Sequence, residues 1–265
     1  MRLLLGALSL ALAVLAVGWQ FREWRPLDPA TSPPVRGEPV VDVHRVARDS
    51  SSRGNHGVNQ GSPEQGLAGR RGTAYSYNSA GSWTQVTSAP ELNPGRRDFV
   101  ISAWVNLRVA PRQQETNDLV RKGLSFTPGG EFKLEIVADG RPKCTIKDVE
   151  GREASIMVLD VDVADRRWHR VGCARTGDRL SVILDNTVTD KRIRVGEIRN
   201  TMTLSIGSKY GWEDVPDGRI DEVSYYVQRR VETGRTRGRN VAERIERIQT
   251  RDNAVGLWRL DETPD

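Results

Sequence analysis

Cysteine, histidine and methionine are all scarce in this chain. Its 265 residues include 2 Cys, 3 His and 3 Met. There is no Cys-x-x-Cys pair and no Cys/His cluster, so nothing in the sequence indicates a zinc-type site. An even cysteine count instead predicts one disulfide, Cys144 with Cys173, of the kind that forms in oxidising compartments.

His169 and Cys173 stand close enough in sequence to raise the question of a thiol nucleophile and its base. On a β-strand, however, residues four positions apart are separated by about 13 Å, whereas a nucleophile and its base must come within about 3 Å. If the segment is a strand, the pair is not a catalytic dyad. We expect His169 to be a partly buried histidine with satisfied hydrogen bonds.

Long hydrophobic runs are also lacking. The apolar run from Leu3 to Val17 has 15 residues, the length of a signal-peptide core and short of the roughly 20 needed to span a bilayer. Residues 1–18 are therefore predicted to be a signal peptide cleaved after Gly18. The alternatives are an uncleaved membrane anchor and a buried core helix. Signal or anchor predicts a protein that is secreted or held on the outer face of the cytoplasmic membrane.

Excess positive charge is confined to one region. The formal net charge is +5, and residues 229–251 contain 8 Arg and 3 Glu, which is 8 − 3 = +5. The remainder is close to neutral, which argues against nucleic acid as a partner. Arg244, Arg247 and Arg251 fall at helical spacing and could present one exposed stripe to an anionic polymer or to membrane headgroups. Such stripes are more often simply solvated.

Strand patterns and turn signals dominate the rest of the chain. Residues 19–39 include five prolines and are predicted to be an extended linker. From residue 40 onward, strands are expected at 98–107, 132–138, 179–186, 203–208, 218–227 and 254–262, with a hairpin turn at Asp139-Gly140. One helix is expected at 240–250, capped by Asn240 with Glu243 three residues on. Residues 40–265 are thus predicted to be an all-β antiparallel β-sandwich with one short C-terminal helix.

Five segments, in order, resemble motifs of laminin G-like domains of the concanavalin A-like superfamily. They are RDSSSRGNHG (48–57), DFVISAWVNL (98–107), LVRKG (119–123), RRWHRVGCARTGDRLSVILDN (166–186) and DGRIDEVSYY (217–226). The resemblance implies a jelly roll, and secreted bacterial members often carry a Cys pair on the corresponding strands. The family's W-x-L-D-E strand, usually N-terminal, stands here at Trp258–Glu262. The two ends of the domain are therefore expected to lie close together.

The resemblance also implies candidate calcium ligands. They are Asp49 and Asn55 in the first motif and Asp221 in the last, because calcium binds carboxylate and carbonyl oxygens. The alternative is that Asp49 and Asn55 only cap a turn.

Candidate ligand contacts are the aromatic residues of two segments. Tyr210 and Trp212 lie in the loop 208–218, and a second cluster holds Tyr75, Tyr77 and Trp83. Such amphipathic rings suit sugars or protein hot spots. The alternative is that these rings pack the rim of the sandwich.

The carboxylates do not support a glycosidase. Laminarinase-like glycosidases on this fold carry their acids at E-x-D-x-x-E spacing, and no such spacing occurs here. Asp221 and Glu222 are adjacent on a strand and are therefore expected to face opposite ways. Asp160 and Asp162 would share a face, but nothing else supports them. The sequence therefore favours a non-catalytic binding module outside the cytoplasm that recognises a polysaccharide or a cell-surface protein. The alternatives are a purely structural or protein-interaction module and a glycoside hydrolase of the same superfamily.

Overall fold

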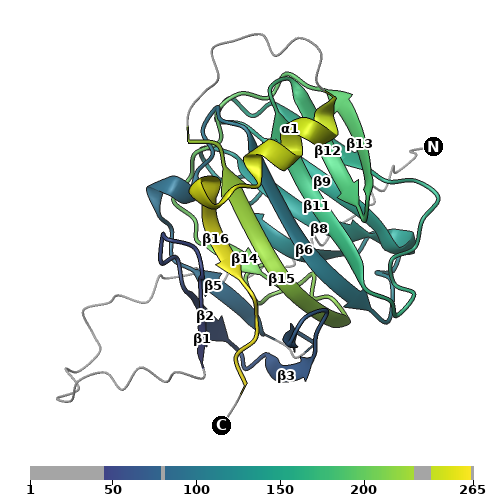
Figure 1. The fold of residues 1–265 in the computed structure, drawn as a ribbon. Coiled ribbons are helices and arrows are strands. Elements are labelled where there is room, and N and C mark those ends of the chain that lie inside the picture. Colours follow the sequence, from purple (N-terminus) through teal and green to yellow (C-terminus); the bar gives the residue numbers. More distant parts are fainter. Residues whose placement is uncertain (1–44, 79–80, 230–239, 264–265) are drawn as a thin grey trace, which may run out of the picture. The chain divides into compact units, whose positions relative to one another are not determined.

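The structure, a computed structural model, describes residues 45–78, 81–229 and 240–263. These residues form two antiparallel β-sheets that pack face to face (Figure 1). The segments 1–18 and 19–39 and the arginine-rich residues 230–239 lie outside the described residues. Within the described ranges, no helix combines the length and the apolar character that crossing a membrane requires.

One sheet, here called sheet A, has the strand order β1-β2-β5-β14-β7-β8-β9-β10. The bounds of its strands are β1 Val46–Ala47, β2 Gly57–Gln60, β5 Trp83–Val86, β14 Leu204–Ile206, β7 Thr116–Lys122, β8 Glu131–Val137, β9 Arg141–Lys147 and β10 Glu153–Met157. The predicted turn between β8 and β9 is confirmed. Asp139 and Gly140 both have positive φ, 63° and 69°, which Asp and Gly tolerate in tight turns.

The second sheet, sheet B, has the order β13-β12-β11-β6-β15-β4-β3, and β16 pairs with β15. Its strands are β13 Thr187–Arg192, β12 Arg179–Leu184, β11 His169–Thr176, β6 Phe99–Leu107, β15 Gly218–Val227, β4 Thr73–Ser76, β3 Glu64–Ala68 and β16 Ala254–Trp258. The last strand ends four residues earlier than predicted, because Leu260 adopts positive φ (58°) and leaves the sheet. The antiparallel β-sandwich predicted from the sequence is confirmed.

Alternation along the strands places the core between the sheets. On β6, Phe99, Ile101, Ala103 and Val105 face inward and are fully buried. The predicted disulfide is also present: Cys144 on β9 and Cys173 on β11 are bonded, with their Cα atoms 5.0 Å apart. Since β9 belongs to sheet A and β11 to sheet B, the bond crosses the core and joins the two sheets.

The helix α1, Val241–Ile248, covers one end of the outer face of sheet B (Figure 1). The predicted cap is confirmed, since the Asn240 side chain accepts a hydrogen bond from the Glu243 amide at 2.8 Å. Ile245 and Ile248 pack on the outward-facing Val100, Ala174 and Ile183 in a second, smaller apolar cluster. The helix therefore hides part of this face and leaves the neighbouring part open.

The two ends of the described domain meet, as the displaced W-x-L-D-E segment predicts. Asp49 forms a β-bridge with Trp258. Glu262 accepts hydrogen bonds from the Arg48 amide and from the Tyr75 hydroxyl, both at 2.8 Å. The C-terminal strand thus closes the sheet against the first turn of the domain.

Candidate functional site

The structure separates the aromatic residues predicted to bind ligand. Trp212 is 67% exposed, but Tyr210 is only 7% exposed and Tyr75 is completely buried. The Tyr210 hydroxyl accepts a hydrogen bond from the Gly123 amide at 2.8 Å, and its ring packs edge-on against Trp83 at 5.6 Å. The prediction that Tyr75 and Tyr210 contact a ligand is therefore wrong. Both rings are packing elements, and Trp83 is half-buried behind Tyr210.

Tyr77 belongs to the interior as well. Its ring is completely buried, and its hydroxyl hydrogen-bonds the Thr84 side chain at 2.8 Å. Burial raises the pKa of this phenol well above its ordinary value. Trp212 is thus the one large exposed ring among the aromatic residues that the sequence singled out.

The turn at Asp49 is held by protein donors rather than arranged around an ion. Its Oδ1 accepts hydrogen bonds from the amides of Ser51 and Leu257, and its Oδ2 accepts from the Ser51 hydroxyl and the Asn55 amide, all within 2.8 Å. The Asn55 side chain donates to the Val255 carbonyl at 2.7 Å. With these acceptors occupied, the turn does not fit a calcium ion. The turn-capping alternative agrees with these contacts.

Asp221, the third candidate calcium ligand, lies at a different place. It stands opposite Trp104 in the β15–β6 ladder, and its Oδ2 accepts from the amides of Arg70 and Arg71 at 2.6 and 3.0 Å. Burial raises the pKa of this carboxyl to about 6, an effect that the backbone donors only partly offset. Across the described ranges, no three His, Cys, Asp or Glu side chains come together as a metal site.

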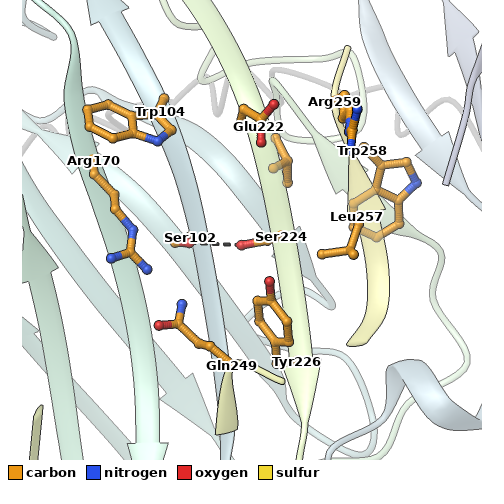
Figure 2. Close-up of a pocket in the computed structure, with 11 residues that line it drawn as sticks. Ser102, Trp104, Arg170, Glu222, Ser224, Tyr226, Gln249, Leu257, Trp258 and Arg259 are labelled. Atoms are coloured by element: carbon orange, nitrogen blue, oxygen red, sulfur yellow. Dashed lines mark hydrogen bonds between the residues drawn. The ribbon is translucent and has the colours of Figure 1, made fainter. Parts of the chain in front are cut away.

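The best-defined candidate site is a groove on sheet B. A groove of about 360 Å³ lies on its outer face, beside α1. Its walls come from β6, β11, β15 and β16 and from the end of α1, with these lining residues: Ser102, Trp104, Arg170, Glu222, Val223, Ser224, Tyr226, Gln249, Leu257, Trp258 and Arg259. Figure 2 shows Trp104 and Glu222 at one end, Gln249 and Tyr226 at the other, and the Ser102–Ser224 pair between them.

The floor of the groove is set by strand parity. Because the odd-numbered residues of β6 face the core, Ser102 and Trp104 must face outward. Across the ladder, Ser102 pairs with Ser224 and Trp104 pairs with Arg170. The two serine hydroxyls hydrogen-bond each other at 2.9 Å. The groove therefore has small hydroxyls in its centre and larger side chains around them.

A β-bulge brings an additional carboxylate into the groove. The β15–β6 pairing shifts between Asp221 and Ser224, and Glu222 has positive φ (48°). Two residues of β15 then oppose one residue of β6, which resets the alternation of faces. The expectation that Asp221 and Glu222 face opposite ways is therefore wrong. Asp221 stands opposite the outward-facing Trp104, and Glu222 lines the groove on that same face.

The other acidic pair is not on a strand at all. Residues 158–168, which include Asp160 and Asp162, form a loop between β10 and β11. Asp160 has positive φ (56°), and Asp162 accepts a hydrogen bond from the Ala164 amide at 2.7 Å. Their expected shared strand face does not exist, so strand spacing gives no reason to pair Asp160 with Asp162 as an acid and a base.

Aromatic rings on the outer face of sheet B are accompanied by arginines. The Arg70 guanidinium lies 4.8 Å from the centre of the Trp104 ring, and Arg219 lies 5.5 Å from that of Trp168. Trp168 immediately precedes β11 and is half-buried. Arginine over an indole face is a favourable cation–π contact.

His169 is the satisfied histidine that the sequence predicts. Its Nδ1 lies 2.9 Å from Asp185 and its Nε2 lies 3.1 Å from Asp165. Burial alone would lower the pKa of the imidazole, but hydrogen bonds to Asp185 and then Asp165 outweigh it and raise that pKa. Cys173 is already bonded to Cys144, so the catalytic dyad is excluded.

The predicted arginine stripe on the helix is broken up by the fold. Arg244 forms an ion pair with Asp98 at 3.2 Å. Arg251 lies beyond α1 in the short 3₁₀ segment Arg251–Asn253. Only Arg247 is both helical and exposed, so the three do not form one exposed face.

A second hollow, larger and more open, lies where loops meet at residues 88–97, 128–129, 149 and 197–201. Lys122 and Arg175 lie beneath it. Lys122 donates to both oxygens of Asn200, and Arg175 donates to the carbonyls of Gly95, Arg97 and Gly196. Burial lowers the pKa of Lys122 to about 8. These buried cations hold the loops together through neutral oxygens.

Sequence reasoning missed Trp104, Arg170 and Tyr226 as site residues. The sequence did hold a signal for Trp104. In DFVISAWVNL it alternates with the apolar core positions and shares the opposite face of the strand with Ser102. Tyr226 similarly alternates with the buried Tyr225. The position of Gln249 depends on how α1 docks onto sheet B, which no local pattern reveals.

Comparison with known proteins agrees with this architecture. A comparison with curated proteins returned no match. Among solved structures, the binding domain of botulinum neurotoxin serotype G is similar, with a TM-score of 0.54 and 12% identity over 68% of this chain and 45% of that one. The serotype D ligand-binding domain in complex with N-acetylneuraminic acid has a TM-score of 0.51 and 11% identity, over 65% and 42% of the two chains.

This chain therefore matches less than half the length of either toxin structure, and at such identity the likeness concerns the fold alone. The family evidence is more direct. The sequence profile of the laminin G-like family, described as "Concanavalin A-like lectin/glucanases superfamily", matches residues 78–232. This match covers more than half of the chain, and the fold agrees with it. The chain belongs to the laminin G-like family of the concanavalin A-like lectin/glucanases superfamily.

Proposed function

We propose that the domain is a non-catalytic carbohydrate-binding module that acts outside the cytoplasm, and that the groove on sheet B is its binding site. The observation that carries the proposal is the composition of the groove. It combines two half-buried aromatic rings, Trp104 and Tyr226, with hydroxyl, amide and charged groups on a rigid sheet face. Sugars present apolar C–H faces and many hydroxyls, and sites of this kind match both.

Trp104 would be the main apolar contact. Arg70 lies over one side of its indole ring, and a sugar face would stack on the opposite side. Tyr226 would close the opposite end of the groove beside Gln249 (Figure 2). Ser102 and Ser224 would supply hydroxyl donors and acceptors at the floor. The similar fold of the serotype D neurotoxin ligand-binding domain, solved in complex with N-acetylneuraminic acid, supports a sugar as the type of ligand.

Carboxylate placement favours binding over hydrolysis. Glycosidases usually act through two carboxyl groups on either side of the scissile bond. Glu222 is the single carboxylate among the residues that line the groove. Asp221 lies on the same face, but it is completely buried and bound to the Arg70 and Arg71 amides. A sugar in the groove would therefore meet one carboxylate and not two.

An extracytoplasmic location is part of the proposal. The disulfide between Cys144 and Cys173 supports it, because such bonds persist in oxidising compartments. The apolar run at Leu3–Val17 supports export or membrane attachment from the sequence side.

One observation favours a second candidate, a protein partner. Trp212 stands exposed on the loop 208–218, and it is not among the residues that line the groove. Exposed tryptophans are frequent hot spots of protein interfaces. A cell-surface protein would then bind through Trp212, and the groove variants would leave that binding unchanged.

The test is a glycan-array screen of the purified full chain, followed by titration of any sugar that binds. Replacing Trp104 with Ala should weaken binding at least roughly tenfold, because truncated aromatic anchors commonly cost that much. Replacing Trp212 with Ala is the matched control and should leave the affinity unchanged. Sugar binding that depends on Trp212 and not on Trp104 would contradict the proposed site.

A further inference from the structure

Three guanidinium groups surround the groove without a carboxylate partner. Arg170 and Arg259 line it, and Arg70 lies over the Trp104 ring. Within the described ranges, the structure records no ion pair or side-chain hydrogen bond for these three guanidiniums. Arg170 is half-buried, whereas Arg70 and Arg259 are exposed. Together the three positive charges give this face a potential that attracts anions.

Several arginines elsewhere in the fold are paired with carboxylates. Arg121 pairs with Asp118 and Glu131, Arg152 with Asp148, and Arg179 with Asp190. Arg108 likewise pairs with Asp217. Direct guanidinium–carboxylate pairs are therefore common in this domain, whereas none is recorded within the described ranges for Arg70, Arg170 or Arg259.

Arg170 is the best placed of the three to hold a ligand. It stands directly opposite Trp104 on the neighbouring strand. Figure 2 shows its side chain running from the Trp104 end toward Gln249, alongside the Ser102–Ser224 pair. A group bound there would lie over the centre of the groove. The planar guanidinium fork matches a carboxylate or a sulfate with two parallel hydrogen bonds.

The one groove carboxylate lies away from this position. Glu222 is at the Trp104 end of the groove, on the side of Arg259 in Figure 2. A ligand that carries one negative charge could meet Arg170 with its anionic group while presenting hydroxyls to Glu222. The arrangement thus orients an acidic sugar as well as attracting it.

We propose that the groove selects sugars that carry a negative charge, and that Arg170 binds the anionic group. This inference rests on the proposed carbohydrate-binding function and narrows its ligand class. It concerns a carboxylate or sulfate on the sugar, and the two sources are distinguished below. The exposed Arg247 of α1 is not part of the site.

The experiment uses matched pairs of polymers that differ in charge alone. The purified full chain is titrated, at physiological ionic strength, with polygalacturonate and with its methyl-esterified form, and with dextran sulfate and dextran. The expected result is tighter binding to at least one charged member than to its neutral counterpart. The pair that shows the difference identifies carboxylate or sulfate as the group recognised.

Variants then assign the effect to a residue. Arg170→Gln should weaken binding of the charged polymer roughly tenfold to a hundredfold, the usual range for a charge-assisted hydrogen-bonded pair, and should abolish the charge preference. Arg170→Lys keeps the charge without the fork and should recover part of it. Arg247→Gln removes the same charge from an exposed helix position and should change binding less than twofold.

Each outcome decides the matter. Equal binding of charged and neutral polymers, an unchanged Arg170→Gln variant, or an equal loss in Arg247→Gln overturns the acidic-sugar inference. If Trp104→Ala still abolishes binding of the neutral polymers in any of these cases, the proposed carbohydrate-binding function stands and only the acidic-sugar inference falls. If the wild-type chain binds no glycan at all, both proposals fall. The Arg170 variants should fold normally, because the structure records no hydrogen bond from its guanidinium to the described residues.

Discussion

Trp104 on β6 and Asp221 on β15 lie directly opposite each other in sheet B, and a β-bulge begins at the next residue, Glu222. The buried Asp221 holds the backbone of the loop at Arg70 and Arg71, and Arg70 in turn covers one side of the Trp104 ring. The Asp221 carboxyl group therefore holds in place the loop whose Arg70 packs on Trp104, a residue that lines the groove. Its burial has consequences that can be measured.

Asp221→Asn should make the domain more stable at pH 8 by about 1–2 kcal/mol. Burial raises the pKa of Asp221 to about 6, above the ordinary 3.8. The folded protein therefore binds this proton more tightly than the unfolded chain, and the stabilisation is lost as pH rises from about 4 through 6. Asparagine keeps an oxygen for the Arg70 and Arg71 amides without the buried charge.

Urea unfolding at pH 4 and pH 8 checks this prediction. The difference between variant and wild type should be present at pH 8 and nearly absent at pH 4. A difference of the same size at both values would mean that ionisation of Asp221 is not its origin. Asp252→Asn, at an exposed position, is the matched control.

His169 should give the opposite pH dependence. Hydrogen bonds to Asp185 and Asp165 raise the pKa of its imidazole despite partial burial. The stabilisation is thus fully present below the ordinary histidine pKa near 6.5 and is lost as pH rises through the folded value. His169→Gln should lower the melting temperature more at pH 5.5 than at pH 9. An equal loss at both pH values would show that the protonated His169 imidazole is not what stabilises the fold.

Removing the disulfide should cost roughly 3.5 kcal/mol of unfolding free energy, the value the chain-entropy model gives for a loop of this length. Cys144 and Cys173 are separated by 29 residues and join the two sheets across the core. The urea midpoint of the double variant Cys144→Ala, Cys173→Ala should fall accordingly, and reductant should lower the wild-type midpoint but not that of the variant. A wild-type midpoint that is insensitive to reductant would argue against the bond.

Metal removal should leave the domain unchanged. The four acceptor positions of Asp49 are taken by Ser51, Asn55 and Leu257, so neither calcium nor a chelator should shift the melting temperature. Asp49→Ala should by contrast destabilise the domain by about 2–4 kcal/mol, because several buried donors lose their partner. A calcium-dependent rise in melting temperature that Asp49→Ala abolishes would restore the calcium hypothesis.

The sequence predicted the fold well because the signals of this fold are local. Alternating apolar residues, the Asp139-Gly140 turn and the Asn240 cap each act within a few residues, and each is found where it was expected. The closing contact between the two ends also followed from a displaced motif. The pairing of Cys144 with Cys173 needed only an even count.

The site could not be predicted in the same way, because it depends on relationships between distant segments. Loop composition pointed to Tyr210, but its hydroxyl finds Gly123 across the fold and the ring becomes buried. The bulge at Glu222 also places Asp221 and Glu222 on the same face, although alternation along a regular strand would put them on opposite faces. Only the pairing of β15 with β6 reveals this bulge. Likewise, Arg170 stands out only once the fold shows that its guanidinium lines the groove without an ion pair to any described residue.

The measurement that tests the central claim most directly is sugar binding by three proteins: wild type, Trp104→Ala and Trp212→Ala. Affinities for the strongest glycan from the array would be measured by calorimetry, after circular dichroism has shown that all three fold alike. The groove account predicts at least a roughly tenfold loss for Trp104→Ala and none for Trp212→Ala. Full affinity in Trp104→Ala, with loss in Trp212→Ala, would contradict it and move the binding site to the loop 208–218.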